Sequence, residues 1–188
     1  MSDSAATRVG GWRFFLWWML AFLGFPIGGF LALVLVGSVD GAVSGALGGA
    51  LAGAVIGAAQ WLVLRRYMRV GPEWVVATAL GVAIGDALGA LLTGAGTGLG
   101  DLLITGLATG VAVGLLQWGL VLRGRVLLAS LLWPPVVAIA WPLGWVVTSV
   151  VIGINVERGF YAFGASGALV FAAITGLTML FMLRGRTR

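Results

Sequence analysis

Asp86 is the acidic residue best placed to do chemistry in this sequence, because it lies within an apolar stretch and not beside one. A carboxylate held away from water must meet a partner, a cation or a proton. We expect Asp86 to face a polar cavity and to bind a cation or exchange a proton there. The other residues expected at this ligand or ion site are Ser149, Thr148, Thr93, Asp101, Asn155 and Glu157. The alternative is structural, with Asp86 reaching water at the end of its helix or pairing with Arg158.

Missing residue types restrict the chemistry further. The sequence holds no Cys and no His, and all 11 cationic residues are Arg. Thiol nucleophiles, thiolate or histidine metal sites and Ser-His catalysis are therefore excluded. Acid catalysis would depend on Asp86, Asp101 and Glu157 alone. We expect a protein that is not an enzyme and that carries no metal and no cofactor.

The stretches around these acids are those of a membrane protein. Hydrophobic residues make up 61% of the 188 residues, charged residues 9%, and the mean hydropathy is +1.11. A soluble domain has about 25% charged residues. Six apolar runs reach the length of about 20 residues that a bilayer-spanning helix needs, namely 14–36, 43–64, 74–93, 102–122, 127–152 and 163–183. We expect one all-α transmembrane domain over 1–188, with a first span too long for a signal peptide.

Charge is distributed unevenly between the two sides of these spans. One side carries ten of the 11 arginines with Asp3 and Glu73, and the other carries Arg158 with the remaining four acids. The positive-inside rule then places both termini in the cytoplasm. The arginine side suits anionic lipids, and no nucleic acid partner is expected. The heavy use of Ala, Gly, Val, Leu and Arg is typical of GC-rich bacteria, so we expect a bacterial cytoplasmic (inner) membrane.

Pairs of spans repeat along the chain. "GALAGAVIGAAQWLVLRR" in the second span matches "GLATGVAVGLLQWGLVLR" in the fourth, so that Gln60 and Gln117 share a GxxxGxxQW pattern. In the odd spans "LGFPIGG" matches "LGVAIGD" and, more loosely, "LGWVVTS", which sets Asp86 against Gly29 and Ser149. These matches predict three helical-hairpin repeats, at about 12–66, 72–123 and 125–186. Repeats with an even number of spans share one orientation, which predicts pseudo-threefold symmetry about the membrane normal.

Glycines recur every four residues in the second and fourth spans. Small residues at this spacing let helices approach closely in lipid, where apolar burial supplies no drive for pairing. The expected packing residues are Gly41, Gly45, Gly49, Gly53, Gly57, Gly106, Gly110 and Gly114. We expect these ladders to pack within the chain, and the alternative is a seam between copies of the chain.

Aromatic, proline and glutamine residues complete the pattern. Trp12, Trp17, Trp18, Trp61, Trp74 and Trp118 lie near the arginine side and are expected in the interfacial belt. Prolines at 26, 134, 135 and 142 predict kinked or broken first and fifth spans. Gln60 and Gln117 are expected to form hydrogen bonds between helices.

The repeated GxxxGxxQWxxLxR pattern resembles that of small glycine-rich multi-pass membrane proteins of bacteria, over most of the chain. In size and number of spans alone, the chain is also similar to the substrate-binding components of energy-coupling-factor transporters. Two functions remain open. The first, which we favour from the sequence, is a non-enzymatic subunit that packs with itself or with a membrane partner. The second is a small-solute, cation or proton transport component with a polar site around Asp86.

Overall fold

A computed structural model describes residues 10–124, 128–152 and 165–184 of the chain. In these residues every regular element is helical. The α-helices are α1 (Gly10–Leu20), α2 (Gly24–Leu35), α3 (Ala42–Leu64), α4 (Glu73–Thr93), α5 (Leu99–Gln117), α6 (Trp133–Ile152) and α7 (Ala165–Arg184). Three short segments adjoin them: the 3-10 turn η1 (Ala21–Leu23), the π-helical η2 (Trp118–Leu122) and the 3-10 segment η3 (Leu128–Leu132).

Six helical stretches are long and apolar enough to cross a membrane, which confirms the predicted number of spans and the all-α class. They are Gly11–Leu35, Ala42–Leu64, Glu73–Thr93, Leu99–Leu122, Ser130–Val151 and Ala165–Arg184. The chain is by these measures a multi-pass membrane protein. Each predicted boundary falls within a few residues of the observed one.

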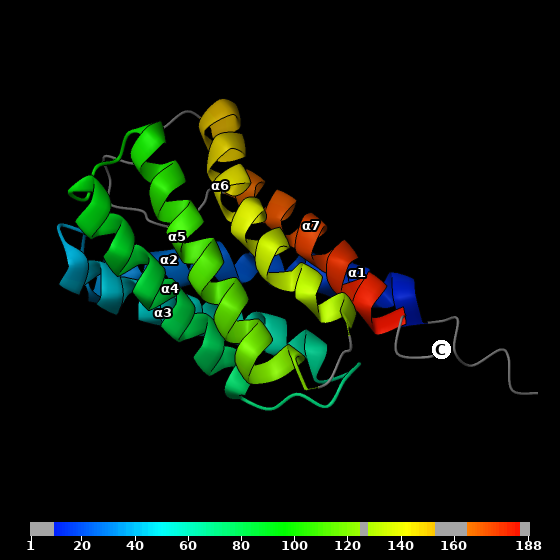
Figure 1. The fold of residues 1–188 in the computed structure, drawn as a ribbon. Helices are drawn as coiled ribbons and strands as arrows, with labels where there is room; N and C mark the ends of the chain where they lie inside the picture. Colours follow the sequence, from blue (N-terminus) through cyan, green and yellow to red (C-terminus); the bar gives the residue numbers. More distant parts are fainter. Residues whose placement is uncertain (1–9, 125–127, 153–164, 185–188) are drawn as a thin grey trace, which may run out of the picture.

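The six spans form a closed ring in the order of the chain. Each span packs chiefly against the spans before and after it, and α7 packs back against α1. Figure 1 shows this succession, with the red α7 lying against the blue α1. The interior of the ring is therefore lined by one face of every span.

The first span is broken, as its proline predicts. α1 ends at Leu20, the 3-10 turn η1 follows, and α2 begins at Gly24. Pro26 lacks the N–H that would bond to the carbonyl of Phe22 four residues earlier, so a regular helix cannot continue through this point. In the fifth span Pro134 and Pro135 occupy the first turn of α6, where a missing N–H costs little, and the helix continues through Pro142.

The buried polar side chains lie inside the ring together with its apolar core, and large apolar side chains cover the outside. The buried polar residues include Gln60, Thr78, Asp86, Thr109, Gln117 and Thr175. Large exposed apolar side chains come from every span, among them Ile27, Leu47, Ile84, Leu107, Ile139 and Leu177. This arrangement suits a solvent of lipid tails, because polar groups in the bilayer must be satisfied within the protein.

Seven of the eight predicted packing glycines lie at helix contacts within the chain. A Cβ added to Gly49, Gly53 or Gly57 would lie 2.8–2.9 Å from atoms of α4, and one added to Gly45 would lie 3.0 Å from the Asp86 carbonyl oxygen. Gly106, Gly110 and Gly114 meet α6 in the same way, at 2.7–2.9 Å. Gly41 is the exception, because it precedes α3 and has no atom within 4 Å of an added Cβ.

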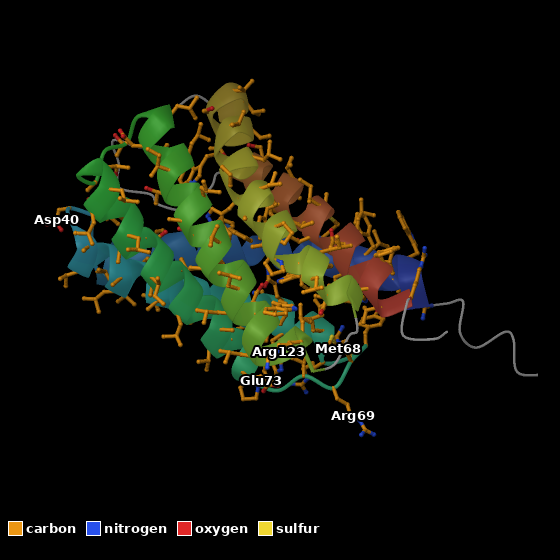
Figure 2. The ribbon with its side chains drawn as sticks, in the orientation of Figure 1. Asp40, Met68, Arg69, Glu73 and Arg123 are labelled. Atoms are coloured by element: carbon orange, nitrogen blue, oxygen red, sulfur yellow. The ribbon has the colours of Figure 1, made fainter. Side chains whose placement is uncertain are left out.

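The described charges divide between the two ends of the bundle. Arg65, Arg66 and Arg69 follow α3, Arg123 follows η2, and both Arg13 and Arg184 lie where the described chain begins and ends. Asp40 and Asp101 lie at the opposite ends of these helices, and Figure 2 shows Asp40 far from Arg69 and Arg123. The arginine end and the acidic end are named accordingly below.

Candidate functional site

Asp86 lies on the inner face of α4, about two turns before the helix ends at Thr93. Its side chain is 5% exposed. Its Oδ1 accepts a hydrogen bond of 2.9 Å from the hydroxyl of Thr109 on α5. Within the described residues this is its one side-chain partner, and it forms no ion pair there. The carboxylate is therefore held at depth by a single hydroxyl.

Glycines bring the neighbouring helices close to this carboxylate. A Cβ on Gly49 of α3 would lie 3.0 Å from Asp86 Oδ2. On the other side, a Cβ on Gly85 would clash with Thr109, so α5 also approaches closely. Asp86 is thus positioned by backbone contacts on two sides, which leave little freedom for the side chain to turn away.

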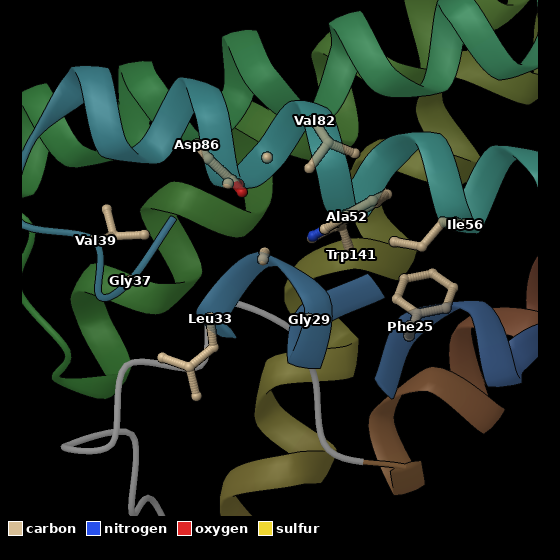
Figure 3. A pocket seen from close by; sticks show the side chains of 13 residues that line it. Phe25, Gly29, Leu33, Gly37, Val39, Ala52, Ile56, Val82, Asp86 and Trp141 are labelled. Carbon is tan, nitrogen blue, oxygen red and sulfur yellow. The ribbon is translucent and has the colours of Figure 1, made fainter. Parts of the chain in front are cut away.

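Asp86 borders a cavity inside the ring. The cavity is lined by Phe25, Gly29, Ala32, Leu33, Gly37, Val39, Gly48, Gly49, Ala52, Ile56, Val82, Asp86 and Trp141. These residues come from α2, α3, α4, α6 and the turn between α2 and α3. Figure 3 shows Asp86 directed from α4 toward the segment of α2 that carries Gly29 and Leu33. Among the described residues that line the cavity, Asp86 is the one that carries a charged group.

The size of the cavity limits what it holds. The volume open to the centres of water-sized spheres is about 30 Å³, whereas one water molecule needs about 10–15 Å³ by this measure. There is room for water or a small ion and not for an organic solute. The cavity extends to Gly37 and Val39 near Asp40, and so toward the acidic end of the bundle.

Aromatic rings close the cavity toward the arginine end. Phe25, Trp141 and Phe171 contact one another with ring centroids 5.1–5.8 Å apart. Such tilted and edge-to-face pairs pack tightly. The three rings separate the carboxylate of Asp86 from the arginine end of the bundle.

Three tryptophans fill the interior of the ring between these aromatic residues and the arginine end. Trp18 of α1, Trp74 of α4 and Trp133 of α6 contact one another with centroids 5.7–6.5 Å apart, and all three are buried. The expected belt position is therefore wrong for Trp18 and Trp74. Both indoles lie on the inner helix face, where each finds a hydrogen-bond acceptor.

Each indole N–H in this layer donates to an even-numbered span. Trp18 donates to Thr175 Oγ1 at 3.1 Å, Trp74 to Gln60 Oε1 at 3.1 Å, and Trp133 to Gln117 Oε1 at 2.8 Å. Gln117 Nε2 also donates to Thr78 Oγ1 at 2.9 Å. These bonds confirm the prediction that both glutamines link helices.

The four other predicted site residues that the structure describes do not join Asp86. Thr93 and Ser149 donate hydrogen bonds to carbonyls of their own helices, Gly89 and Val146 respectively. Thr148 lies at the contact of α6 with Gly167 of α7, and Asp101 folds over the turn before α5. None of these four lines the cavity. Asn155, Glu157 and Arg158 lie outside the described residues.

Sequence reasoning missed Thr109, the partner of Asp86. A threonine within a transmembrane span does not by itself indicate a binding site, because its hydroxyl can bond to the backbone of its own helix. One signal was available. The offset of 57 that matches Gln60 with Gln117 also pairs Thr109 with Ala52, so a hydroxyl replaces a methyl group in the same span pair that carries Asp86.

The chain matches no protein family model, no curated protein and no solved structure.

Proposed function

We propose that this chain is the cation- or proton-binding component of a membrane transport process, with Asp86 as its ion-binding carboxylate. The observation that carries the proposal is a buried acid on the wall of an interior cavity, with one hydroxyl partner and no ion pair among the described residues. An acid at the centre of a spanning helix costs about 2.5–3.5 kcal/mol on insertion scales. A water, proton or cation at the carboxylate would offset that cost.

The size and lining of the cavity support an inorganic ion or proton as the ligand. A water-sized space excludes a vitamin or sugar in this conformation. In the part of the chain that the structure describes, the site offers one carboxylate and one hydroxyl without a second acid or base beside them, which supports a role other than catalysis.

The alternative function, a subunit that packs with a partner through its glycine ladders, has less support. The ladders of α3 and α5 are occupied by α4 and α6 of the same chain. A homo-oligomer or a membrane partner would have to use the outer apolar faces instead, and these faces equally suit lipid.

Proton or cation flux in proteoliposomes tests the proposal. Vesicles that contain the chain are given a pH gradient or a Na⁺ or K⁺ gradient, and internal pH or cation is followed with a dye. We expect flux with the unaltered chain and its loss with Asp86→Asn. Asp40→Asn is the matched control, since Asp40 is exposed at the acidic end and Asn keeps the acceptor that Ser44 uses. Equal flux with Asp86→Asn and the unaltered chain would overturn the proposal.

We also propose that both termini face the cytoplasm of a bacterial cell, with the arginine end against anionic lipids of the inner membrane. Six described arginines gather at that end, and the guanidinium groups of Arg65 and Arg123 lie 4.9 and 6.0 Å from the rings of Trp61 and Trp118. Gly124 and Gly41 are open positions at the two ends. In this cysteine-free chain, Gly41→Cys should react with an impermeant thiol reagent in intact cells and Gly124→Cys should not. The reverse pattern would overturn the orientation.

We further propose that three hairpin repeats, at 12–66, 72–123 and 125–186, surround a pseudo-threefold axis. The tryptophan layer supports this, because each indole bonds to the preceding repeat in cyclic order. Trp74 bonds back to Gln60 and Trp133 bonds back to Gln117, while Trp18 completes the cycle with Thr175.

Glycine contacts within each hairpin support the same repeat. An added Cβ would crowd Gly28 against Ala52 and Gly85 against Thr109, and in the third hairpin one on Gly167 would crowd Gly144. Under this pairing Asp86 corresponds to Gly29 and Trp145. Ser149, the match drawn from the sequence, lies one turn further along α6.

A further inference from the structure

The hydroxyl of Thr109 has one hydrogen and two acceptors within reach. Thr109 Oγ1 lies 2.8 Å from the carbonyl oxygen of Thr105 and 2.9 Å from Oδ1 of Asp86. Both distances are those of good hydrogen bonds. A hydroxyl donates a single hydrogen and has two lone pairs with which it accepts.

The protonation state of Asp86 decides whether both contacts are hydrogen bonds at once. If the carboxylate is ionised, Thr109 donates its one hydrogen either to Asp86 Oδ1 or to the carbonyl oxygen of Thr105. Thr109 Oγ1 and the acceptor that receives no hydrogen then repel each other, because only lone pairs lie between them. If Oδ1 carries a proton, Asp86 donates to Thr109 and Thr109 donates to Thr105. The chain of two bonds is then complete, with every donor and acceptor in its proper role.

We propose that the ion bound at Asp86 is a proton, held on Oδ1 and donated to Thr109 Oγ1. The inference deepens the proposed function and rests on it. In loading, a hydronium ion in the cavity gives a proton to Oδ1, so that one of its O–H bonds breaks, the Oδ1–H bond forms and water is left. On release the Oδ1–H bond breaks and a water molecule takes the proton to form hydronium.

The surroundings of the carboxylate favour a proton over a metal ion. Ca²⁺ and Mg²⁺ take about six to eight oxygen ligands, whereas Asp86 is the one residue with a side-chain oxygen among the described residues that line the cavity. Thr109 adds a single hydroxyl. Among the described residues, each packed element contributes uncharged groups: Gly45 and Gly49 from α3, Thr109 from α5, Gly29 from α2 and Trp141 from α6.

Infrared difference spectroscopy tests the inference on the full chain in lipid. We expect a carboxylic-acid C=O band that disappears on alkalinisation and is absent in Asp86→Asn. Asp40→Asn, the exposed control, should keep it. Thr109→Val should move the band to higher frequency because the acceptor is lost, and Thr109→Ser should restore its position.

Metal ions provide the opposing test. NaCl, KCl or CaCl₂ added at constant pH should leave the band unchanged. Displacement of the band by one of these salts would assign a metal cation to the site and overturn the inference, while Asp86-dependent flux of that cation would leave the proposed function standing. Absence of an Asp86-dependent band at every pH would also overturn the inference. A band without Asp86-dependent flux would instead refute the proposed function.

Discussion

The two halves of the ring interior differ in how their polar groups are matched. Toward the arginine end, three indole N–H groups meet three acceptors, and the rings fill the space between them. Toward the acidic end, one carboxylate meets one hydroxyl beside a cavity. The half toward the arginine end is closely packed with its polar groups paired, whereas the half toward the acidic end contains a cavity beside a carboxylate with one partner.

The difference follows from the size of the residues that point inward. The tryptophan half has an indole from each odd-numbered span. In the cavity half, Asp86 faces Gly29 and Gly49, which leave space that no side chain fills. A buried polar group is stabilising where its partners are complete and costly where they are not. We therefore expect substitutions in the tryptophan half to affect stability most, and substitutions in the cavity half to affect ion binding.

The largest expected loss of stability comes from Trp133→Ala. The change removes a buried indole that contacts two others and leaves Gln117 without its donor. Removal of a buried Trp typically costs about 3–5 kcal/mol. Denaturation in detergent measures it. Trp12→Ala is the control, since Trp12 is 68% exposed, and a similar loss there would contradict the distinction between buried and peripheral indoles.

Gly53→Leu tests the backbone contact where the two halves meet. A Cβ at Gly53 would lie 2.8 Å from the carbonyl of Thr78 and 3.0 Å from Val82, one residue on each side of the junction. Overpacking of this kind costs about 1–3 kcal/mol. Thermal unfolding should show the loss for Gly53→Leu and not for Gly41→Leu, because Gly41 belongs to the same ladder but has open space around it. Equal losses would contradict the view that Gly53 acts through its close contact with α4.

Gln117→Leu should cost less, about 1–2 kcal/mol. The side chain is lost both as the acceptor for Trp133 and as a donor to Thr78, and the indole N–H stays buried. Gln60→Leu removes one such bond, to Trp74, so its effect should be smaller. Chemical denaturation of both variants compares them, and a greater loss with Gln60→Leu would contradict the bond count.

Asp86→Asn should have the smallest effect on stability, below about 1 kcal/mol. The amide Nδ2 donates to Thr109 in the way proposed for the protonated acid, so the two-bond chain is kept. Unfolding at neutral pH measures the change, together with the flux assay. A loss greater than that of Gln117→Leu would place Asp86 with the structural polar groups of the tryptophan half.

The spans could be predicted because the length and hydropathy of a segment determine them. Whether a single side chain faces the interior of the ring or the lipid could not be predicted in the same way. Trp17 and Trp18 are neighbours in the sequence, yet Trp17 is 44% exposed and Trp18 is 1% exposed. Their distance from the arginines is nearly equal, so position along the span placed both in the belt. Only the helix phase set by packing separates them.

The same limit applies to the site. The sequence singled out Asp86 from its depth in a span, since depth can be counted along the chain. Ser149 was matched to Asp86 through the repeated pattern of the odd spans, and Thr148 lies next to it, but α6 turns Thr148 toward α7 and lets Ser149 bond to its own backbone. The offset between the second and fourth spans marks Thr109 as a hydroxyl, but its contact with Asp86 depends on the packing of α4 against α5 through the glycines at their interface.

The π-helical segment η2 has a consequence for the way the fourth span reaches the arginine end. Arg65 and Arg66 follow Gln60 by five and six residues, and Arg123 follows Gln117 by six. The Arg65 N–H bonds to the carbonyl of Trp61, and the Arg123 N–H bonds one residue further back in count, to Trp118. The wider turn of η2 includes Gly119, which is exposed.

A π turn absorbs an added residue as a local bulge and leaves the rest of the helix in phase. Leu64, at the end of α3, and Leu122, at the end of η2, are both fully buried. The wider turn therefore carries the fourth span to its arginine with an apolar side chain still facing the interior of the ring.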